Sequence, residues 1–175
     1  MPIQIGQAEP GWDDPIGLMT ACHRRIERFL GTLCAAARQA AERILEPDEI
    51  EAVERSLRYF RDAAPHHTAD EEQDLFPALT RKQPEAAVAI GNLKSDHARA
   101  VLLHTRADQI GREWIEAGRL SGPALQEFGE ATSQLESLYR GHIRLEEAEV
   151  FPLAASVLDV AELDSIGRRM AQRRG

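Results

Sequence analysis

Apolar side chains recur along this chain at the 3.6-residue period of amphipathic α-helices, in segments separated by proline- and glycine-containing turns. No segment keeps the two-residue alternation of a strand, so the pattern predicts no sheet. Long helices are expected at about 15–45, 48–82 and 83–117 and from the turn at 121–123 to 157, with a shorter one at 159–173. Four long helices joined by short turns predict an all-α protein, an up-down-up-down antiparallel four-helix bundle.

The 175 residues are enough for one domain at ~150 residues per domain. We expect an N-terminal arm at 1–14, the bundle at 15–157 and a C-terminal helix or tail at 158–175. Trp12 is a candidate to dock the arm on the bundle. The sequence leaves open whether the last helix packs as a fifth element or projects as an interaction tail.

Charge and composition exclude several classes of protein. The net charge is −8, and the 21 Lys and Arg residues are interspersed with 29 Asp and Glu, so we expect no nucleic-acid partner. No apolar run approaches the ~20 residues of a membrane span. Cys22 and Cys34 lie ~18 Å apart along one predicted helix, too far for a disulfide. With no export signal recognisable, these features predict a reduced, cytoplasmic protein without a membrane partner.

A repeat at an offset of 75 residues carries most of the chemistry. The segment HTADEEQDLFP at 67–77 aligns without gaps with HIRLEEAEVFP at 142–152, and five of eleven positions are identical. Each copy lies on an even-numbered helix, and each odd-numbered helix adds one histidine to its apolar stripe, His23 or His97. The chain is therefore predicted to contain two similar hairpins, each with one His followed by one His-x-x-x-Glu.

Residues four apart on a helix share one face, so each His-x-x-x-Glu can aim an imidazole and a carboxylate at one point. The six candidate metal ligands are His23, His67, Glu71, His97, His142 and Glu146. Burying these groups without partners is costly, and a cation cluster removes that cost. The alternative is a structural or interaction bundle without metal, in which each histidine is satisfied internally.

Imidazole and carboxylate donors suit Fe, Zn or Mn, and the absence of a cysteine pair argues against a structural zinc finger. If both glutamates bridge two ions, each six-coordinate ion keeps two open positions. Ferritin-like carboxylate sites need Glu-x-x-His motifs, which this ligand pattern lacks.

These residues resemble the hemerythrin-like (HHE cation-binding) family, four-helix bundles with a non-haem di-iron centre. The resemblance spans about 16–157. Its carriers are the His-Arg-Arg-Ile-Glu stretch at 23–27, Ser-Asp-His at 95–97, and the two His-x-x-x-Glu motifs ahead of Leu-Phe-Pro and Val-Phe-Pro. It implies that the four histidines are terminal ligands of two oxo- or hydroxo-bridged Fe ions and that Glu71 and Glu146 are bridges, with Zn or Mn as substitutes.

The resemblance also narrows the function. Oxygen-carrying members have a fifth histidine four residues before or after the third-helix ligand, where this chain has Leu93 and Val101. We therefore expect a binding or sensing protein for O₂, NO or peroxide rather than an oxygen carrier or a conventional enzyme. The alternative is iron–sulfur cluster repair or iron donation under nitrosative or oxidative stress, because the ligand set is similar to that of di-iron repair proteins. The sequence leaves open whether this protein binds a partner protein or forms a homodimer.

Neighbouring polar residues receive lesser roles. His104 lies ~10.5 Å beyond His97 along the helix axis and should miss the centre. Glu72 and Glu147 are candidates to orient ligand imidazoles. Three more residues lie near the predicted centre but have weaker indications of a role there: His66, Glu27 and Tyr139. Pro65, Pro77 and Pro152 are expected to kink or end the helices that contain them.

Overall fold

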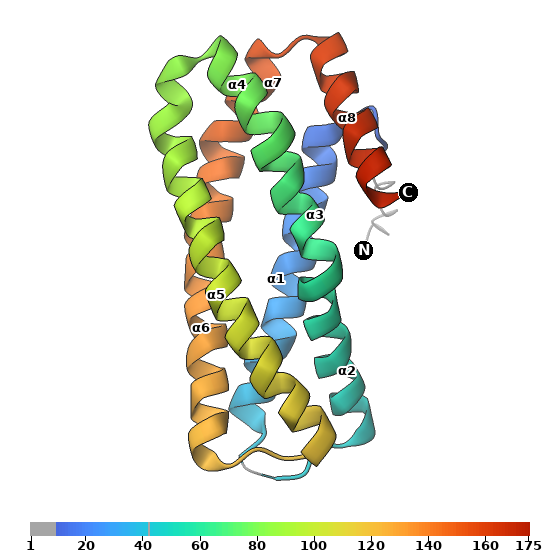
Figure 1. Cartoon of the computed structure of the whole chain (residues 1–175), viewed down its shortest axis with the longest axis vertical. Coiled ribbons are helices and arrows are strands. Elements are labelled where there is room, and N and C mark those ends of the chain that lie inside the picture. Colours follow the sequence, from blue (N-terminus) through green and yellow to red (C-terminus); the bar gives the residue numbers. More distant parts are fainter. Residues whose placement is uncertain (1–9, 42) are drawn as a thin grey trace, which may run out of the picture.

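The computed structural model describes residues 10–41 and 43–175, and Figure 1 shows four long helical rods packed side by side. The first rod is α1 (Pro15–Gln39), and the third is α5 (Ala87–Ala117), preceded by the 3₁₀ turn η3 (Pro84–Ala86). The second rod joins α2 (Pro47–Arg58), η1 (Tyr59–Ala63), α3 (Ala64–Ala69), η2 (Asp70–Leu75) and α4 (Phe76–Lys82). The fourth joins α6 (Gly122–Leu145), η4 (Glu146–Val150) and α7 (Phe151–Val157), and a shorter helix, α8 (Val160–Arg174), follows.

Consecutive rods run antiparallel, and the ring of neighbours closes where α6 packs against α1 (Figure 1). The described ranges contain helices and turns but no strand, which confirms the predicted all-α bundle. Within these ranges, no helix combines the length and the hydropathy that a bilayer crossing requires.

Two apolar clusters fill the bundle and leave a polar layer between them. One cluster, near the α5–α6 turn, contains Trp114 and Phe128, and the other, near α8, contains Phe76 and Phe151. Along α1, the buried Met19 belongs to the second cluster and Ile26 to the first, so the residue between them, at position 23, faces the polar layer. Each fully buried large apolar side chain contributes ~1.5–3 kcal/mol, which lets the two clusters hold a costly polar layer in place.

The first helix is shorter than predicted: it ends at Gln39, not near Leu45. Ala41 has a φ of 44°, and the buried Leu45 donates its N–H to Gly118 O at 2.9 Å. A helix through Leu45 would leave one residue to reverse the chain before α2, whereas antiparallel helices need a connection of ~2–5 residues. Ile44 keeps the helical spacing of the apolar stripe of the first predicted helix, which predicts a core position, but it is 66% exposed in this loop.

Val101 likewise has the helical spacing of the apolar stripe of the third predicted helix, and the core position that this spacing predicts is wrong: Val101 is 61% exposed. Its neighbour Ala100 takes the inward position and is 3% exposed. Because α5 packs against α2 on one side and α6 on the other, its buried stripe passes through position 100 and not through position 101, although the larger apolar side chain is at 101.

Three prolines inside the rods each follow a π turn. Proline has no N–H for the carbonyl four residues earlier, and its ring collides with that carbonyl. Pro65, Pro77 and Pro152 each lie two residues after the end of a π turn, η1, η2 or η4. The N–H of the residue between turn and proline reaches back five residues, as from Phe76 to Glu71 O. The rods run on past the prolines, so Pro77 and Pro152 do not end their helices.

The last helix packs as a fifth element, which answers the question that the sequence left open. Ile166 and Met170 are buried, and α8 contacts α1, α3 and η2. Trp12 docks here: a Cβ at Gly167 would lie 1.8 Å from Trp12 O, so the close approach requires glycine. The Arg174 guanidinium lies 5.9 Å from the Trp12 ring. Most of the predicted arm, 1–9, lies outside the described residues.

Candidate metal centre

All six candidate ligands meet in the polar layer between the two apolar clusters. Each rod of the bundle supplies one histidine, and the second and fourth rods add one glutamate each. All six side chains are buried: His23, His67, Glu71, His97, His142 and Glu146. Their ligand atoms form two groups, one with the first two histidines and one with the last two, and Glu71 and Glu146 belong to both.

Each glutamate joins a histidine of its own hairpin to a histidine of the other. Glu71 Oε1 lies 3.1 Å from His67 Nε2, and its Oε2 lies 3.3 Å from His97 Nε2. Glu146 repeats the pattern, with Oε1 at 3.3 Å from His142 Nε2 and Oε2 at 3.1 Å from His23 Nε2. Adjacent ligand atoms ~2.1 Å from an octahedral ion lie ~3.0 Å apart, so this spacing suits two ions that share two carboxylates.

The buried oxygens of the glutamates fit the same description. Both carboxylate oxygens of Glu71 and of Glu146 have no hydrogen-bond donor, and both residues are 0% exposed. His23 Nε2 is also buried without a hydrogen-bond partner. Buried carboxylates are stable only when they are paired or bind a metal, and four convergent oxygens between imidazole nitrogens are a donor set for divalent cations.

The charges in the layer already favour an ionised Glu71. Burial lowers the pKa of His23, but the carboxylate groups of Glu146 and Glu71 close to its ring outweigh it and raise the pKa to about 10. For His97, burial acts in the same direction and Glu71 again outweighs it, raising the pKa to about 9. Burial would raise the pKa of Glu71, but the charge of His67 holds it well below its usual range. A cation would take the place of these protons, since metal ligation needs neutral imidazoles and ionised carboxylates.

Two further carboxylates hydrogen-bond with two of the histidines and orient their rings, as the sequence predicted. Glu72 Oε1 accepts from His97 Nδ1 at 2.7 Å, and Glu147 Oε1 accepts from His23 Nδ1 at 2.9 Å. Both contacts cross between hairpins, and they leave each Nε2 facing the centre. The turns η2 and η4 explain the geometry, because the smaller rotation per residue of a π turn lets two consecutive glutamates reach inward.

The other two histidines have neighbours that the sequence did not single out. Asp96 Oδ2 lies 3.7 Å from His142 Nδ1. In the first hairpin, the corresponding neighbour of His67 is Cys22, whose pKa burial would raise but hydrogen bonding to His67 lowers, to about 7. Both residues directly precede the histidine of the odd-numbered rod, and this shared position was the available signal.

The lesser candidates lie outside the centre. Tyr139 hydrogen-bonds with His104, at 3.0 Å between the hydroxyl and Nε2, rather than with a ligand of the centre. His104 is absent from both ligand groups, as expected, and burial lowers its pKa to about 4. Glu27 forms an exposed ion pair with Arg24 at 2.6 Å, and His66 also takes no part in the groups.

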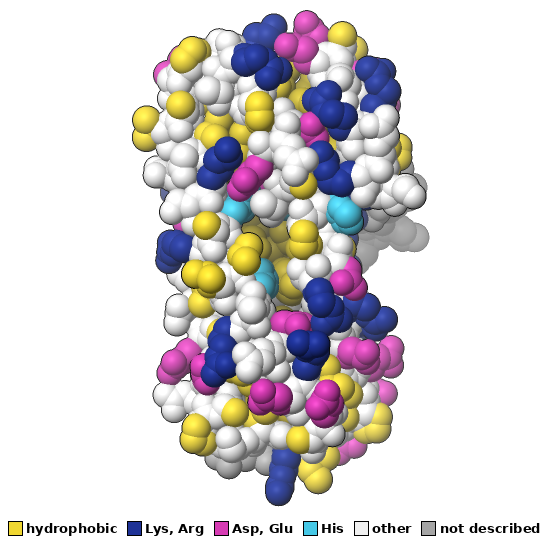
Figure 2. Space-filling model, viewed as in Figure 1, with side chains coloured by type: hydrophobic (Ala, Val, Ile, Leu, Met, Phe, Trp, Pro, Cys, Tyr) yellow, Lys and Arg dark blue, Asp and Glu magenta, His cyan; other side chains and the backbone are white. Residues whose placement is uncertain are grey.

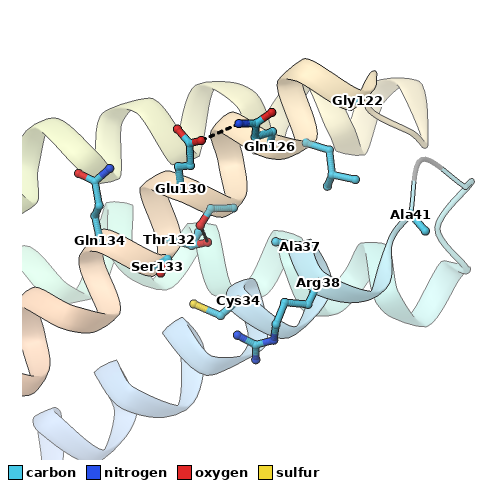
Figure 3. Close-up of a pocket in the computed structure, with 12 residues that line it drawn as sticks. Cys34, Ala37, Arg38, Ala41, Gly122, Gln126, Glu130, Thr132, Ser133 and Gln134 are labelled. Atoms are coloured by element: carbon cyan, nitrogen blue, oxygen red, sulfur yellow. Dashed lines mark hydrogen bonds between the residues drawn. The ribbon is translucent and has the colours of Figure 1, made fainter.

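Figure 3 shows a cavity of about 860 Å³ that is separate from the centre. It lies between α1 and α6, where Cys34, Ala37 and Gly122 line it and Gln126 donates to Glu130 at 2.8 Å. Cys34 follows His23 by eleven residues, or ~16 Å of helix, so this cavity does not open onto the ligands.

Comparison with known proteins agrees with the geometry. Residues 14–154 match the Hemerythrin HHE cation binding domain. The chain belongs to this family. The family resemblance seen in the sequence is thereby confirmed, and the buried His/Glu layer is consistent with a cation-binding domain. A relative in Haemophilus influenzae, named only as an uncharacterized protein, is 28% identical over 164 residues, which cover 93% of this chain and 91% of the relative.

Proposed function

We propose that this protein holds two iron ions and binds a small oxidant, O₂, NO or peroxide, at coordination positions that the protein leaves open. The observation that carries the proposal is the sharing of Glu71 and Glu146 by two groups of buried ligand atoms. His23 and His67 would hold one ion, and His97 and His142 the other. Iron in such a centre supplies redox activity and affinity for diatomic ligands and peroxide.

Three features around the candidate ligands support this role. Glu72 and Glu147 fix the rings of His97 and His23, which keeps each Nε2 directed at the centre. The two apolar clusters enclose the layer from both ends of the bundle. Leu93, buried one turn before His97, offers no further ligand, so neither ion is closed by a fifth histidine.

The test is reconstitution with Fe(II) under anaerobic conditions, followed by desalting, elemental analysis and exposure to O₂ or NO. We expect about two irons per chain, an oxo-bridged diferric absorption after O₂ and a spectral change with NO. Glu71→Ala and Glu146→Ala should each lower the iron content strongly, because each carboxylate serves both ions. His66→Ala is the matched control and should retain both. Equal losses in all three variants, or no spectral response of iron-loaded protein, would refute the proposal.

A further inference from the structure

A second cavity, of about 530 Å³, opens beside the proposed metal centre. It lies between the second rod and α5, with Tyr139 of α6 at its inner wall and His97 at one end. Figure 2 shows the opening as a hollow midway along this face, with hydrophobic side chains at its floor and histidine at its edge. The exposed Val101 at its mouth extends the apolar surface outward.

The cavity exists because small residues occupy core positions. Ala64, Ala100 and Ala107 all line it and are 7%, 3% and 1% exposed. Buried positions on facing helices are normally filled by Leu, Ile or Phe at close-packed density. Ala100 and Ala107, two turns apart on α5, and Ala64 on the second rod leave a space that the neighbouring leucines do not fill.

The walls are apolar and aromatic, with one polar pair. Phe60 stacks on His104 at 4.4 Å between ring centroids, and His104 hydrogen-bonds with Tyr139. A phenol hydroxyl can donate one hydrogen bond and accept another, so this pair can serve one further polar group in the cavity. The charges at the rim are paired: Arg61 contacts Asp62 at 3.6 Å and Asp108 at 2.8 Å, and Asp108 also contacts Arg112 at 3.4 Å, so two arginines face two aspartates.

The size of the cavity exceeds what a diatomic molecule needs. One water occupies ~30 Å³, whereas pockets of ~300–1,000 Å³ accommodate organic ligands. We propose that this pocket binds an uncharged aromatic molecule of one or two rings that carries a single hydroxyl or carbonyl group. The rings would lie against Phe60 and the three alanines, and the polar group would bond to the His104–Tyr139 pair. The inference goes beyond the proposed iron function and requires no bound metal.

The probe for the test is 1-naphthol, titrated by fluorescence into the full-length protein before and after iron loading, with iron content measured in the same samples. We expect saturable binding of one molecule per chain. The charged analogue 1-naphthalenesulfonate should bind at least about tenfold more weakly, because the pocket offers its charge no partner. Absence of 1-naphthol binding, or equal affinity for both compounds, would overturn the proposal.

Variants locate the binding. Ala100→Leu should fill the pocket and weaken 1-naphthol binding by at least about tenfold, and Ala107→Leu serves if that variant does not fold. Ala98→Leu, on the exposed face of α5, is the matched control and should bind as the parent does. Tyr139→Phe should weaken 1-naphthol by about fivefold and leave naphthalene unchanged. Unchanged binding in the filled variants refutes the pocket, whereas 1-naphthol binding without iron uptake refutes the iron function alone.

Discussion

The α8 helix is held on the bundle by arginines that reach two buried aspartates next to Glu71, and Arg173→Met tests how much this contact stabilises the protein. Arg173 bonds to Asp70 and, at 2.8 Å, to Asp74, which are 0% and 4% exposed. Its own side chain is only 18% exposed, so solvent screens these bonds weakly.

The expected loss follows from what remains after the substitution. A hydrogen bond to a charged group contributes ~1.5–3 kcal/mol, and removing one partner of a buried pair can cost ~3–5 kcal/mol. Here Asp70 keeps Arg174 and Asp74 keeps Arg169, so neither carboxylate is left alone. We therefore expect a loss of about 2–3 kcal/mol in the free energy of unfolding, or roughly 4–12 °C in Tm.

The assay is urea unfolding of the metal-free protein, followed by circular dichroism at low and high salt. Arg168→Met is the matched control, because Arg168 pairs with Asp164 on the same helix but the two side chains are 65% and 50% exposed. This variant should lose less than about 0.5 kcal/mol, and less still at high salt. If the two variants lose the same stability, the account of the buried contact is wrong.

Two further predictions concern residues around the centre. Glu72→Gln and Glu147→Gln should each weaken iron affinity by about 10–100-fold, measured by competition with a chelator, while the exposed Glu149→Gln should not; equal affinities would exclude an orienting role. For His104, the folded-state pKa of about 4 lies below the ordinary 6.5, so the unfolded chain binds more protons between these values and stability falls as pH is lowered through that window. His104→Gln should remove this part of the pH dependence in urea titrations, and identical profiles for both proteins would refute it.

The ligand set could be predicted because its signal is repeated. Two copies of His-x-x-x-Glu, each preceded by a histidine at a similar distance, place six groups on inward stripes whatever the details of packing. The structure brings these six side chains together. The orienting roles of Glu72 and Glu147 could also be predicted, because each directly follows a candidate ligand, Glu71 or Glu146, in the sequence.

The remaining features depend on contacts that periodicity does not contain. Ile44 and Val101 are apolar at helical spacing, but a loop closure and the position of α5 between its neighbours expose them. Asp70 and Asp74 have the spacing of a solvated helix face, and only the arginines of α8, about a hundred residues later, explain their burial. The prolines themselves predicted a disturbed helix at three places. That the disturbance takes the form of a π turn depends on how the proline geometry and the inward placement of the neighbouring side chains are satisfied together, which the sequence pattern does not contain.

Each hairpin supplies three of the six ligands and the carboxylate that orients a histidine of the other hairpin. Two separate copies of one hairpin, related by a two-fold axis, would form the same centre at an isologous interface. The chain is therefore equivalent to a symmetric dimer whose subunits are joined covalently through the short connection at Gln83. A homodimer must keep its two metal positions identical, whereas a single chain can let them diverge. Here a thiol, Cys22, is the neighbour of His67 in one half, and a carboxylate, Asp96, is the neighbour of His142 in the other. These two histidines would therefore differ in basicity, and the two ions in affinity for the same ligand.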